Sequence, residues 1–95
     1  MVNDAELVTR ARRADEAAWE TLTRAYAEAA FRLAYLILGD PDDADDVAQE
    51  AFIRAYRGLN RFDLARPFRP WLLSIVANLA RNRLLFLQKH FRIAP

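Results

Sequence analysis

The sequence contains no cysteine, only two glycines, one histidine and no long apolar run. The absence of cysteine excludes disulfides and thiolate metal sites, which fits a reducing compartment such as the cytoplasm. Two glycines are too few for a sheet protein rich in tight turns. No apolar run reaches the roughly 20 residues of a membrane span, and the N-terminus has no basic leader before an apolar stretch. We therefore expect a soluble, cytoplasmic domain without membrane contact.

Side chains that carry out catalysis or bind cofactors are also scarce. His90 has no cysteine near it, so the sequence offers no zinc site. Gly39 and Gly58 both follow expected helices, which leaves no glycine-rich phosphate loop. The acids between residues 40 and 50 lie on an expected helix, and a continuous helix does not wrap oxygen ligands around calcium. We expect no enzymatic activity, no cofactor and no metal ion.

Helical periodicity dominates the chain, in which 54% of residues are hydrophobic. In the longest expected helix, Trp19, Leu22 and Tyr26 begin an apolar stripe with steps of three and four residues, as a buried helix face requires. The expected helices are 4–14, 16–38, 41–57 and one that begins near Pro67 or Pro70 and runs to about 88. We predict an all-α fold, a compact bundle of about four helices over residues 1–84. An apolar C-terminal extension of undetermined role follows over residues 85–95.

The net charge of +1 conceals a strong separation of charge along the chain. Residues 1–50 carry twelve acidic and five basic side chains, a net charge of −7, whereas residues 51–95 carry nine basic and one acidic, a net charge of +8. Such asymmetry indicates nucleic acid or a charged protein as partner. The alternative is an ordinary solvated surface on which the folded chain mixes both signs.

The stretch 40–58 is expected to form a helix with two different faces. Asp40 is a helix cap, Pro41 fits the first helical position, and Gly58 lies just beyond the last turn. One face is built from small apolar residues that allow close packing against the preceding helix. The other face is polar apart from Ile53, which is either incidental or the dry centre of a protein-docking site.

The segment 59–69 and the last helix carry a second candidate surface. Phe62 and Phe68 are interleaved with arginines, a combination suited to unpaired bases because rings stack on bases while guanidinium groups hold phosphates. The alternative is that the loop buries these phenylalanines in the core. On the last helix, a polar stripe without acids is suited to phosphates and base edges. This stripe consists of Ser74, Asn78, Arg81 and Asn82.

Three stretches together resemble region 2 of bacterial sigma factors of the extracytoplasmic-function (ECF) group. They are ELVTRARRADEAAWETLTRAY, LILGDPDDADDVAQEAFIRAYRGLNRFD and PFRPWLLSIVANLARNRL, and they cover roughly residues 4–84. The resemblance implies a transcription initiation factor. Such a domain docks on the clamp helices of RNA polymerase core and melts the promoter minus-ten element by capturing single-stranded, non-template bases.

The resemblance assigns these two roles to separate sets of residues. The polymerase-binding set is Asp42, Asp45, Asp46, Gln49, Glu50, Ile53 and Tyr56. The DNA-binding set is Arg61, Phe62, Arg66, Phe68, Asn78, Arg81 and Asn82. Trp71 lies on the buried face of its helix, which favours a core role over one at the duplex edge.

The chain also departs from the family pattern in two ways. The family's second helical domain, which reads the minus-thirty-five element, is not among these residues, so we expect that these residues alone do not select promoters at both elements; the sequence leaves open whether they are a fragment. Its end is apolar where the family is basic and polar, with Leu84, Leu85, Phe86, Leu87, Phe91 and Ile93. An alternative function is therefore a sigma-like interaction module, held by an anti-sigma protein or self-associating through residues 84–95. Promoter preference and inducing signal are not specified by these residues.

Overall fold

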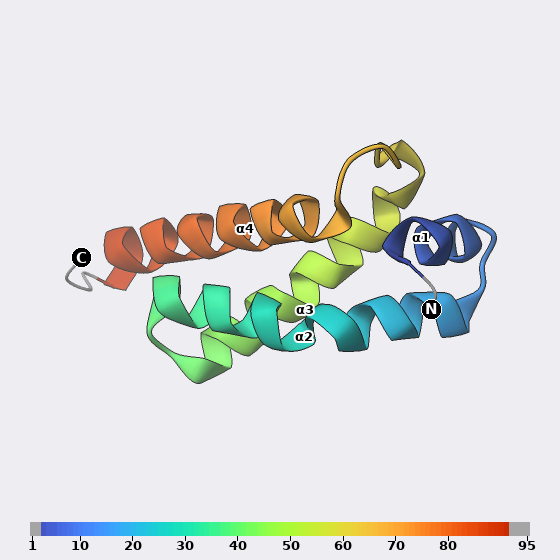
Figure 1. Cartoon of the computed structure of the whole chain (residues 1–95). Helices are drawn as coiled ribbons and strands as arrows, with labels where there is room; N and C mark the ends of the chain where they lie inside the picture. The colour runs from blue at the N-terminus through green and yellow to red at the C-terminus, as the bar shows by residue number, and fades with distance from the viewer. Residues whose placement is uncertain (1–2, 92–95) are drawn as a thin grey trace.

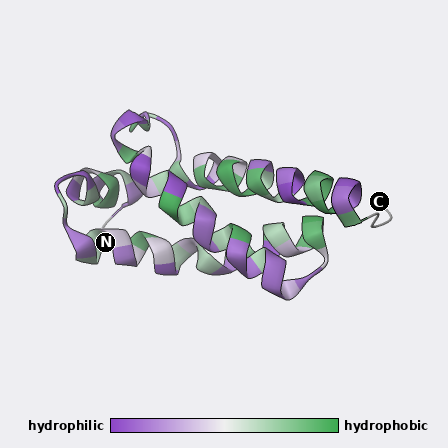
Figure 2. Ribbon diagram, turned by 180° about the vertical axis from the view of Figure 1, so that it is seen from behind, coloured by the Kyte–Doolittle hydropathy of each residue, from purple (hydrophilic) through white to green (hydrophobic). Residues whose placement is uncertain are grey.

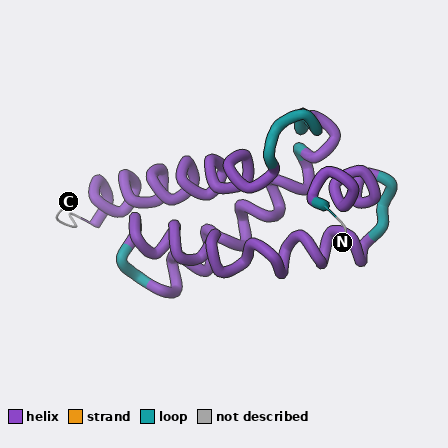
Figure 3. Tube along the Cα trace, viewed as in Figure 1, coloured by secondary structure: helices purple, strands orange, loops and turns teal. Residues whose placement is uncertain are grey.

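The computed structural model describes residues 3–91, and these residues are almost entirely helical (Figures 1 and 3). Four α-helices follow each other along the chain, as the sequence predicted, and one short 3-10 helix lies between the last two, in the segment 59–69 that was expected to be a loop. Their bounds are α1 Asp4–Arg12, α2 Glu16–Leu38, α3 Pro41–Arg57, η1 Leu59–Arg61 and α4 Phe68–Phe91. The molecule measures 46 × 21 × 19 Å, and its long axis follows α2 and α4 (Figure 1).

Side-chain caps fix the start of the first three helices. Asn3, Asp15 and Asp40 each accept a hydrogen bond from a backbone amide of the first turn, at 2.8, 3.3 and 2.9 Å. These amides have no partner within their own helix, which is why a carboxylate or amide oxygen is favoured there. Gly39 ends α2 with a φ of 72°, a left-handed conformation that glycine adopts without steric cost.

Two helix ends differ from the expectation. The first helix stops at Arg12 instead of Ala14, because Ala14 itself takes a left-handed φ of 65° and turns the chain into α2. Gly58 ends α3 without a left-handed conformation, at a φ of −93°, and the chain continues into η1. A Cβ atom at Gly58 would lie 3.6 Å from the Trp71 ring, an ordinary van der Waals contact, so the indole of Trp71 packs against the end of α3 at this residue.

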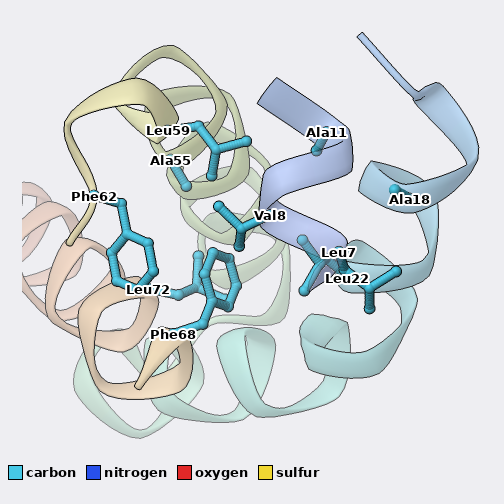
Figure 4. Close-up of a cluster of buried hydrophobic side chains, with 10 residues drawn as sticks. All are labelled: Leu7, Val8, Ala11, Ala18, Leu22, Ala55, Leu59, Phe62, Phe68 and Leu72. Carbon is cyan, nitrogen blue, oxygen red and sulfur yellow. The ribbon is translucent and has the colours of Figure 1, made fainter. Parts of the chain in front are cut away.

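The helices α2, α3 and α4 pack against one another in pairs, and α1 closes one end of the bundle against α2 and η1. Small residues on the inner face of α3 allow this close approach, as predicted. The buried residues of this face are Ala44, Val47, Ala48, Ala51 and Ala55. Larger side chains fill the end of the bundle near α1, where Leu22 and Leu72 are fully buried (Figure 4). Each contributes about 1.5–3 kcal/mol through burial.

At the opposite end of the bundle, a polar contact joins α3 to α4. Arg83 donates from Nη1 to Asp43 Oδ1 at 3.0 Å, and both side chains are about one-third exposed. Solvent screening limits such a pair to about 1 kcal/mol or less. The helix α4 runs through residue 84 without a break to Phe91, while residues 92–95 of the expected apolar extension lie outside the described part. Over residues 3–91, no helix combines the length and apolar character of a membrane span.

Candidate functional site

The outer face of α3 forms an acidic surface, which we call the docking face. It comprises Asp42, Asp45, Asp46, Gln49, Glu50, Ile53 and Tyr56. All are exposed except Glu50, which is partly buried. Asp45 accepts a 2.8 Å hydrogen bond from the Gln49 amide, and Glu50 pairs with Arg54 at 3.2 Å. Within residues 3–91, no basic side chain forms a salt bridge with Asp42, Asp45 or Asp46, so these charges remain available to a basic partner.

The docking face ends in an apolar hollow of about 700 Å³ between the start of α2 and the end of α3. Ile53 and Tyr56 are 46% and 45% exposed at its edge. Trp19 and Phe52 also line the hollow, and the Trp19 ring lies 5.2 Å from that of Tyr56. Sequence periodicity favoured a core role for Trp19 over a role in binding, because it follows the buried stripe of α2, and its ring does pack against the core. The structure leaves it half-buried and part of this surface.

The structure corrects the expectation that the phenylalanines of the loop present their rings to DNA. Phe62 and Phe68 are only 5% and 2% exposed, and their ring centroids are 5.7 Å apart in an edge-to-face contact (Figure 4). The physical reason is that both rings complete the apolar core near α1, together with Trp71, whose centroid is 4.7 Å from that of Phe62. Trp71 itself is half-buried on its predicted inner face.

The loop of residues 62–67 instead separates two hollows in the surface. One, of about 600 Å³, lies between the loop and the start of α4, and we call it the strand hollow. Its lining residues are Arg61, Phe62, Asp63, Arg66, Pro67, Pro70, Trp71 and Ser74. The strand hollow therefore combines two exposed guanidinium groups with the accessible part of an indole ring.

The other hollow, of about 390 Å³, lies between the loop and the start of α1. The Tyr26 hydroxyl donates a hydrogen bond to Asp4 there, and its ring packs 5.7 Å from that of Phe68. Burial, followed by the hydrogen bond to the Asp4 carboxylate, raises the pKa of Tyr26 to about 12. Tyr26 thus stays neutral and holds α1 to the middle of α2.

The polar stripe on α4 is exposed, as predicted. Ser74, Asn78, Arg81 and Asn82 all face solvent, and Ser74 lines the strand hollow. Arg81 donates from Nη2 to Asn78 Oδ1 at 2.7 Å, and this bond uses the acceptor of the Asn78 amide but not its two N–H donors. The end of η1, the loop and this stripe together carry Arg61, Arg66 and Arg81, and their one acidic side chain, Asp63, lies 3.7 Å from Arg66 in an exposed salt bridge. This combination provides cations for phosphates and amides for base edges.

Arg12 in α1 is a residue that the sequence analysis missed. It donates from Nε to the Leu59 carbonyl oxygen at 2.8 Å and from Nη2 to the Phe62 carbonyl oxygen. One signal was present, since Arg12 lies one helical turn after the buried Val8 and therefore on the inner side of α1. Among residues 3–91, no three histidine or carboxylate side chains come together as a metal site.

Comparison with known proteins identifies relatives of this chain. Residues 22–89 match the family described as Sigma-70 region 2. The chain is 36% identical over 77 residues to the ECF RNA polymerase sigma factor SigW of Bacillus subtilis, covering 81% of this chain and 41% of that protein. It is 40% identical over 82 residues to the RNA polymerase sigma-H factor of Pseudomonas aeruginosa, covering 86% and 42%. The chain thus spans less than half the length of these relatives.

A solved structure shares nearly the whole fold. It is an NMR structure of an engineered region 2 of sigmaE in complex with GTAAAA. It is 35% identical to this chain with a TM-score of 0.86, over 97% of this chain and 96% of the other. Family match, relatives and fold agree with the resemblance seen in the sequence. The chain belongs to the sigma-70 region 2 family, as a region 2 domain of the ECF sigma factor group.

Proposed function

We propose that this chain is a transcription initiation factor domain that binds RNA polymerase core and reads the promoter minus-ten element as a single strand. The observation that carries the proposal is the likeness, at a TM-score of 0.86, to a sigmaE region 2 in complex with GTAAAA. The domain acts by binding and not by catalysis. This role places it in the cytoplasm with the polymerase.

The strand is proposed to lie across the loop 62–67 and the stripe of α4. Arg61, Arg66 and Arg81 hold its phosphates, since guanidinium groups form strong charge-assisted hydrogen bonds with phosphate oxygens. An unstacked base enters the strand hollow against the exposed part of Trp71, and the amides of Asn78 and Asn82 read base edges. Phe62 and Phe68 contribute indirectly, because their buried rings anchor the two ends of the loop in the core.

Melting follows from this capture without a chemical step. Unpairing and unstacking a base costs a few kcal/mol. Stacking of each captured base on an aromatic ring contributes about 1–3 kcal/mol of binding free energy. Contacts with the polymerase add to this gain, so the open strand is stabilised relative to the duplex. The same surfaces therefore serve both recognition and melting.

The docking face is proposed to bind the clamp helices of the polymerase. Its three unpaired carboxylates attract basic side chains, and the apolar hollow at Ile53, Tyr56 and Trp19 supplies a water-free centre. Acidic and apolar parts lie side by side on one helix, as a docking surface with a hydrophobic centre and a polar rim requires.

Charge reversal tests the docking face. Asp46→Arg should abolish retention of the domain on immobilised polymerase core, because it places a cation opposite basic side chains. Glu28→Arg is the matched control: it makes the same charge change at an exposed site on α2. Equal retention of Asp46→Arg and the unchanged chain would overturn the docking proposal.

Paired alanine substitutions test strand reading. Asn78→Ala with Arg81→Ala should weaken binding of a fluorescent GTAAAA strand by about tenfold or more in the presence of core, since base-edge and phosphate contacts are lost together. Arg24→Ala with Arg32→Ala removes more charge from α2 and should leave the affinity unchanged. Equal binding of GTAAAA and a scrambled strand by the unchanged chain would contradict base capture.

A second function is supported by the exposed apolar end of α4. Leu85, Phe86 and Phe91 are 62%, 51% and 65% exposed, more than a solvated helix end requires. The proposal is that two copies associate through this segment, with an anti-sigma protein as the alternative occupant. Sedimentation should then show a dimer that becomes a monomer in the Leu85→Gln, Phe86→Gln variant. A monomer with the unchanged sequence would remove self-association.

A further inference from the structure

The loop 62–67 has few attachments of its own to the bundle. Its backbone hydrogen bonds are local: the Arg66 amide donates to the Asp63 carbonyl oxygen at 2.9 Å, and the Ala65 amide donates to Asp63 Oδ1 at 2.9 Å. These bonds shape the loop but do not fix it relative to the helices. Its position depends on the buried rings of Phe62 and Phe68 at its ends and on whatever holds its backbone.

The side chain of Arg12, in α1, binds the backbone at the start of this loop. Its Nε and Nη2 groups reach the carbonyl oxygens of Leu59 and Phe62, which are 47 and 50 residues away in sequence. The planar guanidinium presents several donors in a fixed fork, so one side chain binds two carbonyls three residues apart. These carbonyls belong to the first residue of η1 and to the residue that follows it, and the Leu59 carbonyl oxygen also accepts a hydrogen bond from the Phe62 amide at 3.3 Å.

The guanidinium group of Arg12 binds backbone carbonyl oxygens and not an acidic side chain. It is partly buried, and no acidic side chain of residues 3–91 forms a salt bridge with it. Two other residues of α1, Val8 and Ala11, pack in the same core cluster as Leu59 and Phe62 (Figure 4). The helix α1 is therefore coupled to the first residue of the loop by both apolar packing and directed hydrogen bonds.

We propose that Arg12 is a positioning residue for strand recognition. It touches no DNA; it fixes the loop so that Arg61, Arg66 and the strand hollow keep one arrangement in the free protein. The helix α1 lies outside the residues 22–89 that match the family, so this contribution comes from a part of the chain that the family match does not cover. The inference rests on the proposed function, because it assigns Arg12 a role in that strand site.

Three variants separate positioning from charge and from general stability. Arg12→Ala removes both hydrogen bonds, and Arg12→Lys keeps the charge but not the fork. Arg13→Ala is the matched control, since it removes the same charge one residue away, from an exposed side chain that forms no salt bridge with the described part of the loop. Amide hydrogen exchange of residues 61–66 is measured beside that of the α2 residues 26–34, followed by affinity for a fluorescent GTAAAA strand.

We expect about tenfold faster exchange in residues 61–66 of Arg12→Ala than of Arg13→Ala, with α2 amides unchanged in both. Strand affinity should fall by about tenfold in Arg12→Ala, to an intermediate extent in Arg12→Lys, and not in Arg13→Ala. Retention on polymerase core should be equal in all variants, because the docking face lies on α3.

Other outcomes overturn the inference in recognisable ways. Equal acceleration of loop and α2 amides would show that Arg12 supports only the fold as a whole. Equal strand affinity of Arg12→Ala and Arg13→Ala, with the unchanged chain binding normally, would exclude a positioning role while leaving the proposed function intact. Failure of the unchanged chain to bind strands of any sequence would overturn the proposed function, and this inference with it.

Discussion

The junction between α1 and α2 depends on two neighbouring residues, Ala14 and Asp15. Ala14 has a φ of 65°, the only positive value among the non-glycine residues described. Asp15 caps α2 and accepts a 2.9 Å hydrogen bond from Arg10 Nε, which ties the end of α1 to the start of α2. One residue therefore carries strain at this turn, while the next stabilises it.

Ala14→Gly should stabilise the protein. A left-handed conformation costs an L-residue about 1–2 kcal/mol, whereas glycine adopts it freely. Glycine also loses more conformational entropy on folding, so we expect a net gain of about 0.5 kcal/mol in the free energy of unfolding. Ala25→Gly, at an exposed position inside α2, should instead destabilise by about 1 kcal/mol. Denaturant unfolding measures both, and equal losses would show that Ala14 is unstrained.

The Asp15 carboxylate should make stability depend on pH. The hydrogen bond from Arg10, followed by that from the Ala18 amide, lowers the pKa of Asp15 below its ordinary value. A lowered folded pKa contributes stability above the unfolded pKa of about 4, and this contribution is lost as pH falls through the folded value. Asp15→Asn keeps a cap but not the charge.

The Tm difference between the unchanged chain and Asp15→Asn should therefore be largest near neutral pH and shrink in acid. Thermal unfolding followed by circular dichroism from pH 7 to pH 2 measures it. The pH dependence should weaken in an Arg10→Ala background, where the main cause of the lowered pKa is missing. A constant difference across this pH range would contradict a role for the ionised carboxyl.

At the scale of elements, α3 combines a packing face with the docking face. Its alanine face packs into the bundle while its acidic face points outward, and Figure 2 shows its polar first turns in purple. Close packing leaves no room for a larger side chain at Ala51, which is fully buried. The acidic docking face therefore depends on small residues on the opposite side of the same helix.

Ala51→Leu should destabilise the fold by about 1–3 kcal/mol, because extra methylenes in a packed core force neighbouring side chains and helices apart. Ala27→Leu is the matched control at an exposed position of α2 and should change stability by less than about 0.5 kcal/mol. Urea unfolding of both variants provides the measurement. Equal midpoints would show that α3 tolerates a wider separation from its neighbours.

The bounds of the helices were predictable from the sequence, whereas the burial of the loop phenylalanines was not, and the difference has a physical reason. The bounds of α2 and α3 followed from Asp15, Gly39 and Asp40, because caps and stops act through contacts within one turn. The burial of Phe62 and Phe68 could not be deduced this way. Apolar rings between arginines suit a core as well as a surface, and only packing against α1 decides between them.

The geometry of the candidate site depends even more on tertiary contacts. Exposure of the acidic stripe and of Asn78 was predictable, because helical periodicity fixes which residues share a face. The hydrogen bonds of Arg12 join residues about 50 positions apart, and the hollow beside Trp19 requires the start of α2 to meet the end of α3. Neither contact leaves a local pattern in the sequence.

Across the whole molecule, the charge separation of the sequence becomes a spatial one. The carboxylates of Asp42, Asp45 and Asp46 gather along α3, while η1, the loop and the middle of α4 present Arg61, Arg66 and Arg81. A protein with a net charge of only +1 gains little from long-range attraction to DNA. Binding of a strand should therefore depend on these few local contacts, and the number of contacts can be counted.

The salt dependence of strand affinity measures the number of phosphate contacts. A single strand releases about 0.7 counterions for each phosphate neutralised, so three arginine contacts predict a slope of about −2 for log affinity against log salt. Arg66→Ala should reduce the slope to about −1.4. Arg32→Ala, which removes a charge from α2, should leave the slope unchanged. Fluorescence titrations of GTAAAA between about 50 and 200 mM salt give these slopes. A slope near zero would mean that base contacts alone hold the strand. If Arg66→Ala and the unchanged chain gave the same slope, Arg66 would not be one of the phosphate-binding residues.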